Sequence, residues 1–194
     1  MRNVIPSVLL VVAVAAGANA ERFVAGAVGA SVFRQSYQTV DCLTVTGIPV
    51  TVVDFTGEQV GLYIVGSLSF LVQAAADGVP IDLARYDGRL SVDVMFGVGF
   101  ALPIRGPLSC ILGLGPTFGF LAALPAFGSG APYYGGASAL GIGAGATLRW
   151  LLASRVYLAA TVAGSLQFST IMSVTDSLGW GIVLVPSVGV GLGL

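Results

Sequence analysis

The chain has 194 residues and contains neither histidine nor lysine. Histidine is the side chain whose ordinary pKa suits proton transfer near neutral pH, and the Ser, Asp and Glu residues form no recognisable triad spacing. We therefore expect no catalytic site and no enzyme. All eight basic residues are arginine, and the net charge is −1. Because phosphate binding requires clustered cations, we also expect no nucleic-acid partner.

Cysteine is scarce as well, with Cys42 and Cys110 as the two thiols. Two cysteines without histidine make a poor metal site. The sequence therefore predicts neither a bound metal nor another cofactor.

Charge of either sign is also rare, at 9% of residues, whereas 56% of residues are apolar. Water-soluble domains are usually about 25% charged. A soluble globule of this composition would expose large apolar patches, and such patches promote association. A lipid bilayer as solvent removes that difficulty, so we expect membrane lipid to be the main partner of the surface.

Residues 1–20 have the organisation of a signal peptide for export. Arg2 supplies the positive end, an apolar run extends from Val4 to Ala16, and Ala18 and Ala20 give a small-x-small cleavage pattern. We predict cleavage after Ala20, which leaves residues 21–194 as one domain. The alternative is an uncleaved anchor helix, although the run is shorter than the about 20 residues that span a bilayer.

Large apolar side chains alternate with small or polar ones from Val60 to Leu194. The large residues fall on even-numbered positions, whereas Gly, Ser, Thr, Ala, Gln and a few charges fall on odd-numbered positions. Successive side chains of a strand point to opposite faces, so a period of two predicts long strands with one apolar face. The clearest example is the series Leu90, Val92, Val94, Phe96, Val98, Phe100 and Leu102.

Only helix bundles and closed barrels satisfy every backbone polar group inside lipid. Residues 108–127 are apolar enough for a transmembrane helix, so a helical membrane protein is the alternative. The same window is rich in Gly and Pro, and its large residues alternate, which a lipid-exposed helix has no reason to do. We predict an all-β fold, an antiparallel transmembrane β-barrel.

Seven strands are evident, at residues 23–34, 58–72, 89–102, 108–121, 138–150, 155–168 and 179–194. Bacterial single-chain barrels have an even number of strands and both termini in the periplasm. An eighth strand within residues 43–55, with an irregularity at Gly47 and Pro49, restores an even count. The connections then separate into short periplasmic turns at 54–57, 103–107 and 151–154 and longer external loops at 35–42, 73–88, 122–137 and 169–178.

The outward aromatic residues of these strands gather near the strand ends, where interfacial aromatics are favoured. They are Phe70, Phe118, Phe120, Phe168 and Trp180 at the external side and Phe100 and Trp150 at the periplasmic side. With this pattern, nearly the whole mature chain resembles the small eight-stranded, up-and-down outer-membrane barrels of the OmpA, OmpX and OmpW group. The resemblance implies that the protein lies in the outer membrane of a diderm bacterium.

Small residues dominate the face predicted to line the lumen, among them Gly141, Gly143 and Gly145. The interior of an eight-stranded barrel is just wide enough for side chains to fill it. Glycine on this face therefore leaves a narrow cavity, or it permits close packing against Tyr63, Met95 and Tyr157. The sequence leaves both possibilities open.

The lumen-facing candidates for a functional site are Tyr63, Arg89, Asp93, Arg149, Arg155 and Tyr157. Arg89 and Asp93 share a face near the external end. The other two arginines lie near the periplasmic end, within reach of Asp54 and Glu58. Because buried charges need partners, we expect salt-bridged plugs at the two ends.

Pro116 and Pro186 interrupt two predicted strands near mid-membrane, where a residue without an N–H leaves a gap in the ladder. Similarity to the OmpW group implies a lateral exit from the lumen to the bilayer at such a gap. A local bulge with no transport role is the alternative.

Two functional hypotheses follow from this topology. A weakly polar, Gly-lined lumen suits a narrow passive conduit or a binding site for small apolar solutes. The second hypothesis is a structural or surface-interaction protein whose external loops, with Tyr133 and Tyr134 as exposed aromatics, contact a host or surface ligand. A continuous cavity would support the first hypothesis, and a closed core with ordered loops would support the second.

The two cysteines are predicted to lie at opposite ends of the barrel. Cys42 adjoins the first external loop, whereas Cys110 faces lipid near the periplasmic start of its strand. The Cα atoms of a disulfide come within about 7 Å of each other, but an apolar band of about 25 Å separates these ends. We therefore predict two free thiols.

Overall fold

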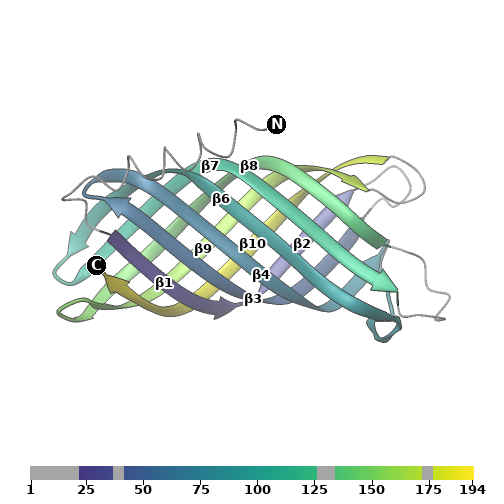
Figure 1. Ribbon diagram of the computed structural model, residues 1–194, viewed down its shortest axis with the longest axis horizontal. Helices are drawn as coiled ribbons and strands as arrows, with labels where there is room; N and C mark the ends of the chain where they lie inside the picture. Colours follow the sequence, from purple (N-terminus) through teal and green to yellow (C-terminus); the bar gives the residue numbers. More distant parts are fainter. Residues whose placement is uncertain (1–21, 37–41, 126–133, 172–176) are drawn as a thin grey trace, which may run out of the picture.

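Figure 1 shows a computed structural model of the chain, which describes residues 22–36, 42–125, 134–171 and 177–194. The predicted signal peptide and parts of three predicted external loops lie outside these ranges. Within them, no helix has the length and apolar character needed to cross a bilayer.

Antiparallel strands form a closed ring, because β1 (Arg22–Gly29) pairs with both β10 and β3. β2 (Ser31–Ser36) continues β1 in the same register against the same two neighbours, so β1 and β2 are one strand of an eight-stranded barrel. The other ring strands are β3 (Leu43–Gly57), β4 (Val60–Ala76), β6 (Tyr86–Arg105), β7 (Leu108–Pro125), β8 (Tyr134–Ala153), β9 (Val156–Ile171) and β10 (Ser177–Gly193). The predicted fold class is confirmed.

The two ends of the barrel differ in their connections. The turns from β3 to β4, β6 to β7 and β8 to β9 are two residues each, at 58–59, 106–107 and 154–155. Strand β1 begins and strand β10 ends at this short-turn end (Figure 1). The opposite, long-loop end includes the connection from β4 to β6, with β5 (Val79–Pro80) and the 3-10 helix η1 (Leu83–Arg85).

Most strands extend beyond their predicted bounds at the long-loop end. β4, for example, continues to Ala76 and β6 begins at Tyr86, so the connection is nine residues rather than the predicted sixteen. Alternation marks only the part of a strand with lipid on one side, whereas ladder hydrogen bonds continue past the apolar band. The sequence pattern therefore underestimated strand length.

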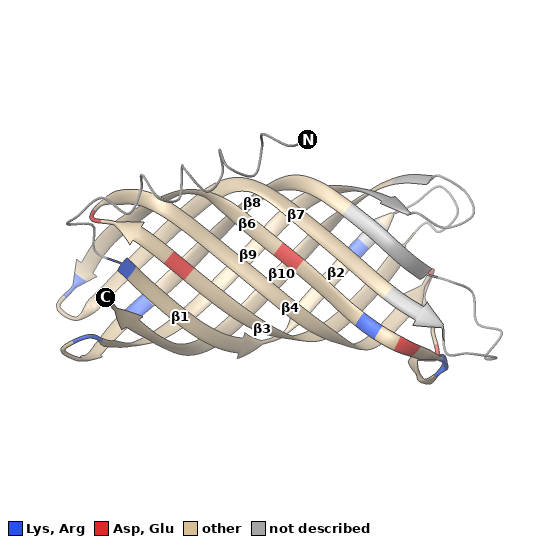
Figure 2. Ribbon diagram, viewed as in Figure 1, with Lys and Arg blue, Asp and Glu red and all other residues tan. Residues whose placement is uncertain are grey.

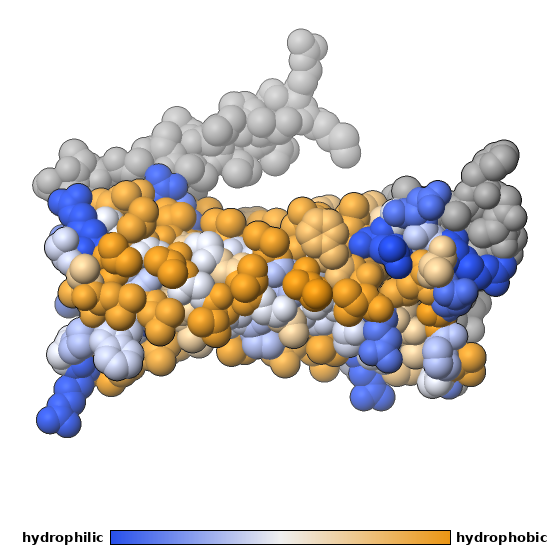
Figure 3. Space-filling model, turned by 90° about the horizontal axis from the view of Figure 1, so that it is seen from below, coloured by the Kyte–Doolittle hydropathy of each residue, from blue (hydrophilic) through white to orange (hydrophobic). Residues whose placement is uncertain are grey.

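The outer face of the barrel is apolar, as Figure 3 shows for the side that it displays. Even-numbered side chains point outward along the central parts of the strands, and Leu140 and Ile142 are 67% and 68% exposed. All seven predicted interfacial aromatics are exposed, and Phe168 and Trp180 lie directly opposite each other on β9 and β10. Charged residues lie mainly toward the two ends of the barrel (Figure 2).

Glycines on the inner face make room for large side chains rather than for a wide channel. A Cβ atom on Gly113 would overlap the Tyr63 ring, and one on Gly145 would lie 2.9 Å from the Tyr63 hydroxyl. Tyr63 itself is fully buried in the lumen. Of the two possibilities that the sequence left open, close packing is the one that the structure contains here.

The simple alternation ends near the long-loop end because the ladders shift there. One shift lies at Thr46 and Gly47, where the sequence predicted an irregularity, and it leaves Val72 of β4 as an extra residue. After it, even-numbered Ala74 is buried. Another shift, between Tyr86 and Gly88 of β6, buries the even-numbered Tyr86 side chain.

Candidate functional site

The long-loop half of the lumen is lined by apolar side chains, which we call the loop-end cluster. Its members are Phe33, Leu43, Val45, Leu71, Ala74, Leu83, Tyr86, Leu121, Val183 and Val185. Leu83 reaches the cluster from η1, whose N-cap residue Asp82 accepts a 3.0 Å hydrogen bond from the Ala84 amide. A cavity of about 30 Å³ lies within the cluster, bordered by Ile81 from the same connection. The connection from β4 to β6 therefore covers an apolar pocket.

A polar layer crosses the middle of the lumen. The Gln167 side-chain amide donates a 2.7 Å hydrogen bond to Oδ1 of Asp93. Gly119 allows this contact, since a Cβ there would lie 2.8 Å from Oε1 of Gln167 and 2.9 Å from Oδ1 of Asp93. The other carboxylate oxygen of Asp93 and the hydroxyl of Thr117 are buried and have no hydrogen-bond partner among the residues that the structure describes.

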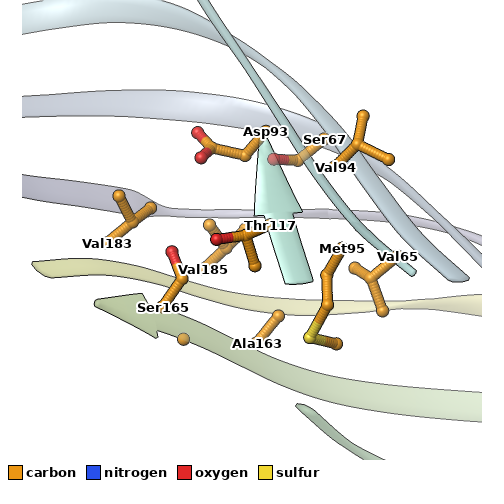
Figure 4. A pocket seen from close by; sticks show the side chains of 11 residues that line it. Val65, Ser67, Asp93, Val94, Met95, Thr117, Ala163, Ser165, Val183 and Val185 are labelled. Carbon is orange, nitrogen blue, oxygen red and sulfur yellow. The ribbon is translucent and has the colours of Figure 1, made fainter. Parts of the chain in front are cut away.

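A second cavity of about 30 Å³ adjoins this polar layer. In Figure 4, Asp93 and Ser67 lie together at the top of the view, and Thr117 lies below them beside Val185. The lining residues Val183 and Val185 also belong to the loop-end cluster, so this mid-lumen cavity lies where that cluster ends.

The short-turn half of the lumen is closed by a second group of buried side chains, the aromatic plug. It consists of Phe23, Ala25, Val53, Phe55, Tyr63, Val65, Met95, Ile111 and Ala159. The Tyr63 hydroxyl lies 2.8 Å from Oγ1 of Thr147, which lies 3.0 Å from Oγ1 of Thr161. Hydrogen bonds and ring packing together fix this half.

Beyond the aromatic plug, Arg149 lies at the short-turn mouth. Its guanidinium carbon is 5.1 Å from the centre of the Phe23 ring and 5.6 Å from that of Tyr157, and its Nε donates a 3.1 Å hydrogen bond to Ser109. Tyr157 is half-buried and packs edge-on against Phe23. Arg155 is exposed in the turn from β8 to β9.

Two acidic residues that were predicted to pair with lumen arginines, Asp54 and Asp93, have other partners in the structure. Asp54 pairs with Arg22, at 2.6 Å on the outer face, because both are even-numbered on neighbouring strands. Asp93 accepts from Gln167 instead of Arg89, which is exposed near the long-loop end. Sequence analysis missed Gln167; its odd position among apolar neighbours in the predicted strand 155–168 was the available signal.

Two prolines coincide with gaps in the hydrogen-bonded wall. Pro116 keeps its pairing with β8, but β6 and β7 are unpaired at Phe96 and Gly97. Opposite Pro186, β1 ends and β2 begins: Ala30 donates a 3.0 Å hydrogen bond to the Pro186 carbonyl, and proline has no N–H to return. The strands stay close at the first gap, since a Cβ on Gly97 would overlap the Leu114 carbonyl.

Cys42 and Cys110 are both free, as predicted. Of the predicted loop aromatics, Tyr133 lies outside the described residues, and Tyr134 is the first residue of β8. Within the described ranges, no three Cys, Asp or Glu side chains gather into a possible metal site.

Comparison with solved structures agrees with this architecture. The outer membrane protein OprG from Pseudomonas aeruginosa matches 91% of this chain and 96% of its own, with a TM-score of 0.63 at 12% identity. The chain has the fold of the small eight-stranded outer-membrane barrels. No family model and no curated protein sequence matches it.

Two further outer-membrane-type barrels superpose less well. Neisserial surface protein A matches 88% of this chain and 96% of its own at 10% identity, with a TM-score of 0.48. The attachment invasion locus protein Ail of Yersinia pestis matches 91% of this chain and 99% of its own at 13% identity, with a TM-score of 0.39.

Proposed function

We propose that this outer-membrane-type barrel binds small apolar solutes in the loop-end cluster and releases them sideways into the bilayer between β6 and β7. The protein performs no catalysis in this proposal, and it reaches the outer membrane after cleavage of its signal peptide behind Ala20. The lumen is a binding site with a lateral exit rather than an open pore. Because the loop-end and mid-lumen cavities are about 30 Å³ each, the aliphatic side chains around them must move apart to admit a solute.

The observation that carries this proposal is the position of the mid-lumen cavity. It is lined by Asp93 to Met95 of β6 and by Thr117 of β7, next to the unpaired segment at Phe96, Gly97 and Pro116. Val183 and Val185 connect the same cavity to the loop-end cluster. An apolar solute that enters at the long-loop end therefore meets, at the end of the apolar pocket, the segment where β6 and β7 are not paired.

The aromatic plug supports a lateral exit over passage through the barrel. Tyr63, Phe23 and Phe55 are at most 2% exposed and are held by ring packing and hydrogen bonds. Moving them would expose buried aromatic surface and break the Tyr63–Thr147 hydrogen bond, which is worth about 1 kcal/mol. Parting two strands over one short unpaired segment disturbs fewer interactions.

Uptake of a small apolar probe by liposomes that contain the folded barrel tests the proposal. Pro116→Val supplies the missing N–H and should restore pairing between β6 and β7, so uptake should fall several-fold. Pro186→Val tests the second gap in the same way. Pro103→Val is the matched control, because Pro103 is exposed on β6 near the short turn and lines neither the loop-end cavity nor the mid-lumen cavity. Unchanged uptake in Pro116→Val would refute the exit between β6 and β7, whether or not Pro186→Val changes uptake.

A further inference from the structure

The short-turn mouth of the barrel contains a cavity of about 280 Å³, which we call the mouth pocket. It is much larger than either lumen cavity and lies on the other side of the aromatic plug. Its lining is mostly polar and consists of Arg22, Phe23, Phe55, Gly57, Glu58, Arg149, Ser154, Arg155, Tyr157, Gly193 and Leu194. The proposed binding of apolar solutes does not use this pocket.

Arginine dominates the charge of the mouth pocket. Three of its lining residues are arginines, and Glu58 is the one acidic side chain among them. Arg22 is already paired with Asp54 on the outer face. Arg155 forms no salt bridge with any residue that the structure describes.

Arg149 is held in place before any ligand arrives. The Phe23 and Tyr157 rings, 5.4 Å apart between centres, lie beside its guanidinium, and Ser109 accepts a hydrogen bond from its Nε. A guanidinium group is a planar fork of N–H donors that matches carboxylate and phosphate oxygens. Fixing the fork in advance lowers the entropy lost when an anion binds.

We propose that the mouth pocket binds a small free oxyanion, a carboxylate or a phosphate, between Arg149 and Arg155. The volume is just below the lower limit of about 300 Å³ for typical ligand sites, so the ligand is a small molecule. The polar lining favours a ligand that is polar over most of its surface, such as a dicarboxylate. Ser154 lies in the same turn as Arg155 and supplies a hydroxyl donor.

Calorimetric titration of the mature protein, folded in a non-ionic detergent at low ionic strength, tests this site with succinate and with inorganic phosphate as probes. Saturable binding of at least one probe is expected, and it should weaken as salt is added because the contacts are ionic. Arg155→Gln and Arg149→Gln should each weaken binding at least tenfold. Absence of saturable binding by the unmodified protein would overturn the proposal.

Arg105→Gln is the matched control, because Arg105 is exposed at the same end of the barrel but does not line the mouth pocket. The affinity of this variant for either probe should stay within twofold of the affinity of the unmodified protein. An equal loss of affinity in Arg105→Gln and Arg155→Gln would mean that the anion is attracted generally to the charged end of the barrel, and it would overturn the proposal of a specific site in the mouth pocket. Heat-modifiable gel mobility confirms that each variant is folded, and Arg155, exposed in a turn, remains informative if Arg149→Gln fails to fold.

Lipid headgroups are the competing source of phosphate at this end of the barrel. Repeating the titration in nanodiscs with and without phosphatidylglycerol distinguishes the two sources. Equal affinity in both supports a free ligand, whereas loss of binding in the anionic discs would show that the guanidinium groups hold lipid phosphate and would overturn the free-ligand proposal.

Discussion

In the short-turn half of the lumen, aromatic rings pack against glycine and join a chain of hydroxyl contacts from Tyr63 to Thr161. In the long-loop half, mainly aliphatic side chains surround a cavity of about 30 Å³ beneath the connection from β4 to β6. Directional contacts fix the first half, and non-directional contacts leave the second half adaptable. The same eight-stranded wall therefore encloses a hydrogen-bonded aromatic core at one end and an apolar cavity at the other.

The largest expected effect comes from breaking the rigid half. Gly113→Val places a side chain where the Tyr63 ring lies, so the ring must leave the plug. Overpacking of this kind costs about 1–3 kcal/mol or more, and we expect a large loss of the heat-modifiable folded form on gels. Gly66→Val is the control, because nothing lies within 4 Å of a Cβ at Gly66. Equal folding of the two variants would contradict the close packing.

A smaller effect is expected at the boundary between the two halves. Gln167→Leu removes the only described hydrogen-bond donor to the Asp93 carboxylate. Leaving a buried polar group without its partner costs about 1–3 kcal/mol, which urea unfolding in detergent would measure. Gln59→Leu, in the exposed turn from β3 to β4, should change the unfolding free energy little. If both variants unfold alike, the polar layer contributes nothing to stability.

The adaptable half should respond in function more than in stability. Ala74→Leu adds methyl groups to the wall of the loop-end cavity, so uptake of a small apolar probe by liposomes should fall several-fold while folding persists. Ala84→Leu adds the same atoms to an exposed position of η1 and should leave uptake unchanged. Normal uptake by Ala74→Leu would show that this cavity does not lie on the path of the solute.

The fold could be predicted from sequence because its cause is local. A period of two on one apolar face, with an even strand count, is sufficient for the barrel and its two types of connection. The site depends on events that break this period. The register shift between Tyr86 and Gly88 turns the Tyr86 side chain inward, and the extra residue Val72 turns the Ala74 side chain inward. No single position in the sequence predicts that either side chain points into the lumen.

The partners of the charged residues were mispredicted for a related reason. Arg22 and Asp54 lie on the outer face of neighbouring strands, where register brings them together, whereas the Asp93 and Gln167 side chains meet across the lumen from β6 and β9. Parity predicts which face a side chain occupies, but contact across the lumen depends on strand stagger. The spacing of residues along the sequence does not show how far neighbouring strands are staggered.

The smallest expected effect concerns the thiols at the two ends. The Thr44 hydroxyl, 3.6 Å from the Cys42 sulfur, and then Arg34 lower the pKa of the Cys42 thiol below its ordinary value. Because the thiolate is the reactive form, labelling of Cys42 by a water-soluble disulfide reagent should reach half its maximal rate at a lower pH than labelling of an ordinary cysteine. Thr44→Val should move that midpoint to higher pH, whereas Thr46→Val, two residues further along β3, should not. In liposomes, lipid-facing Cys110 should stay unlabelled, and equal labelling of both thiols would contradict the placement of Cys42 in water and of Cys110 against lipid.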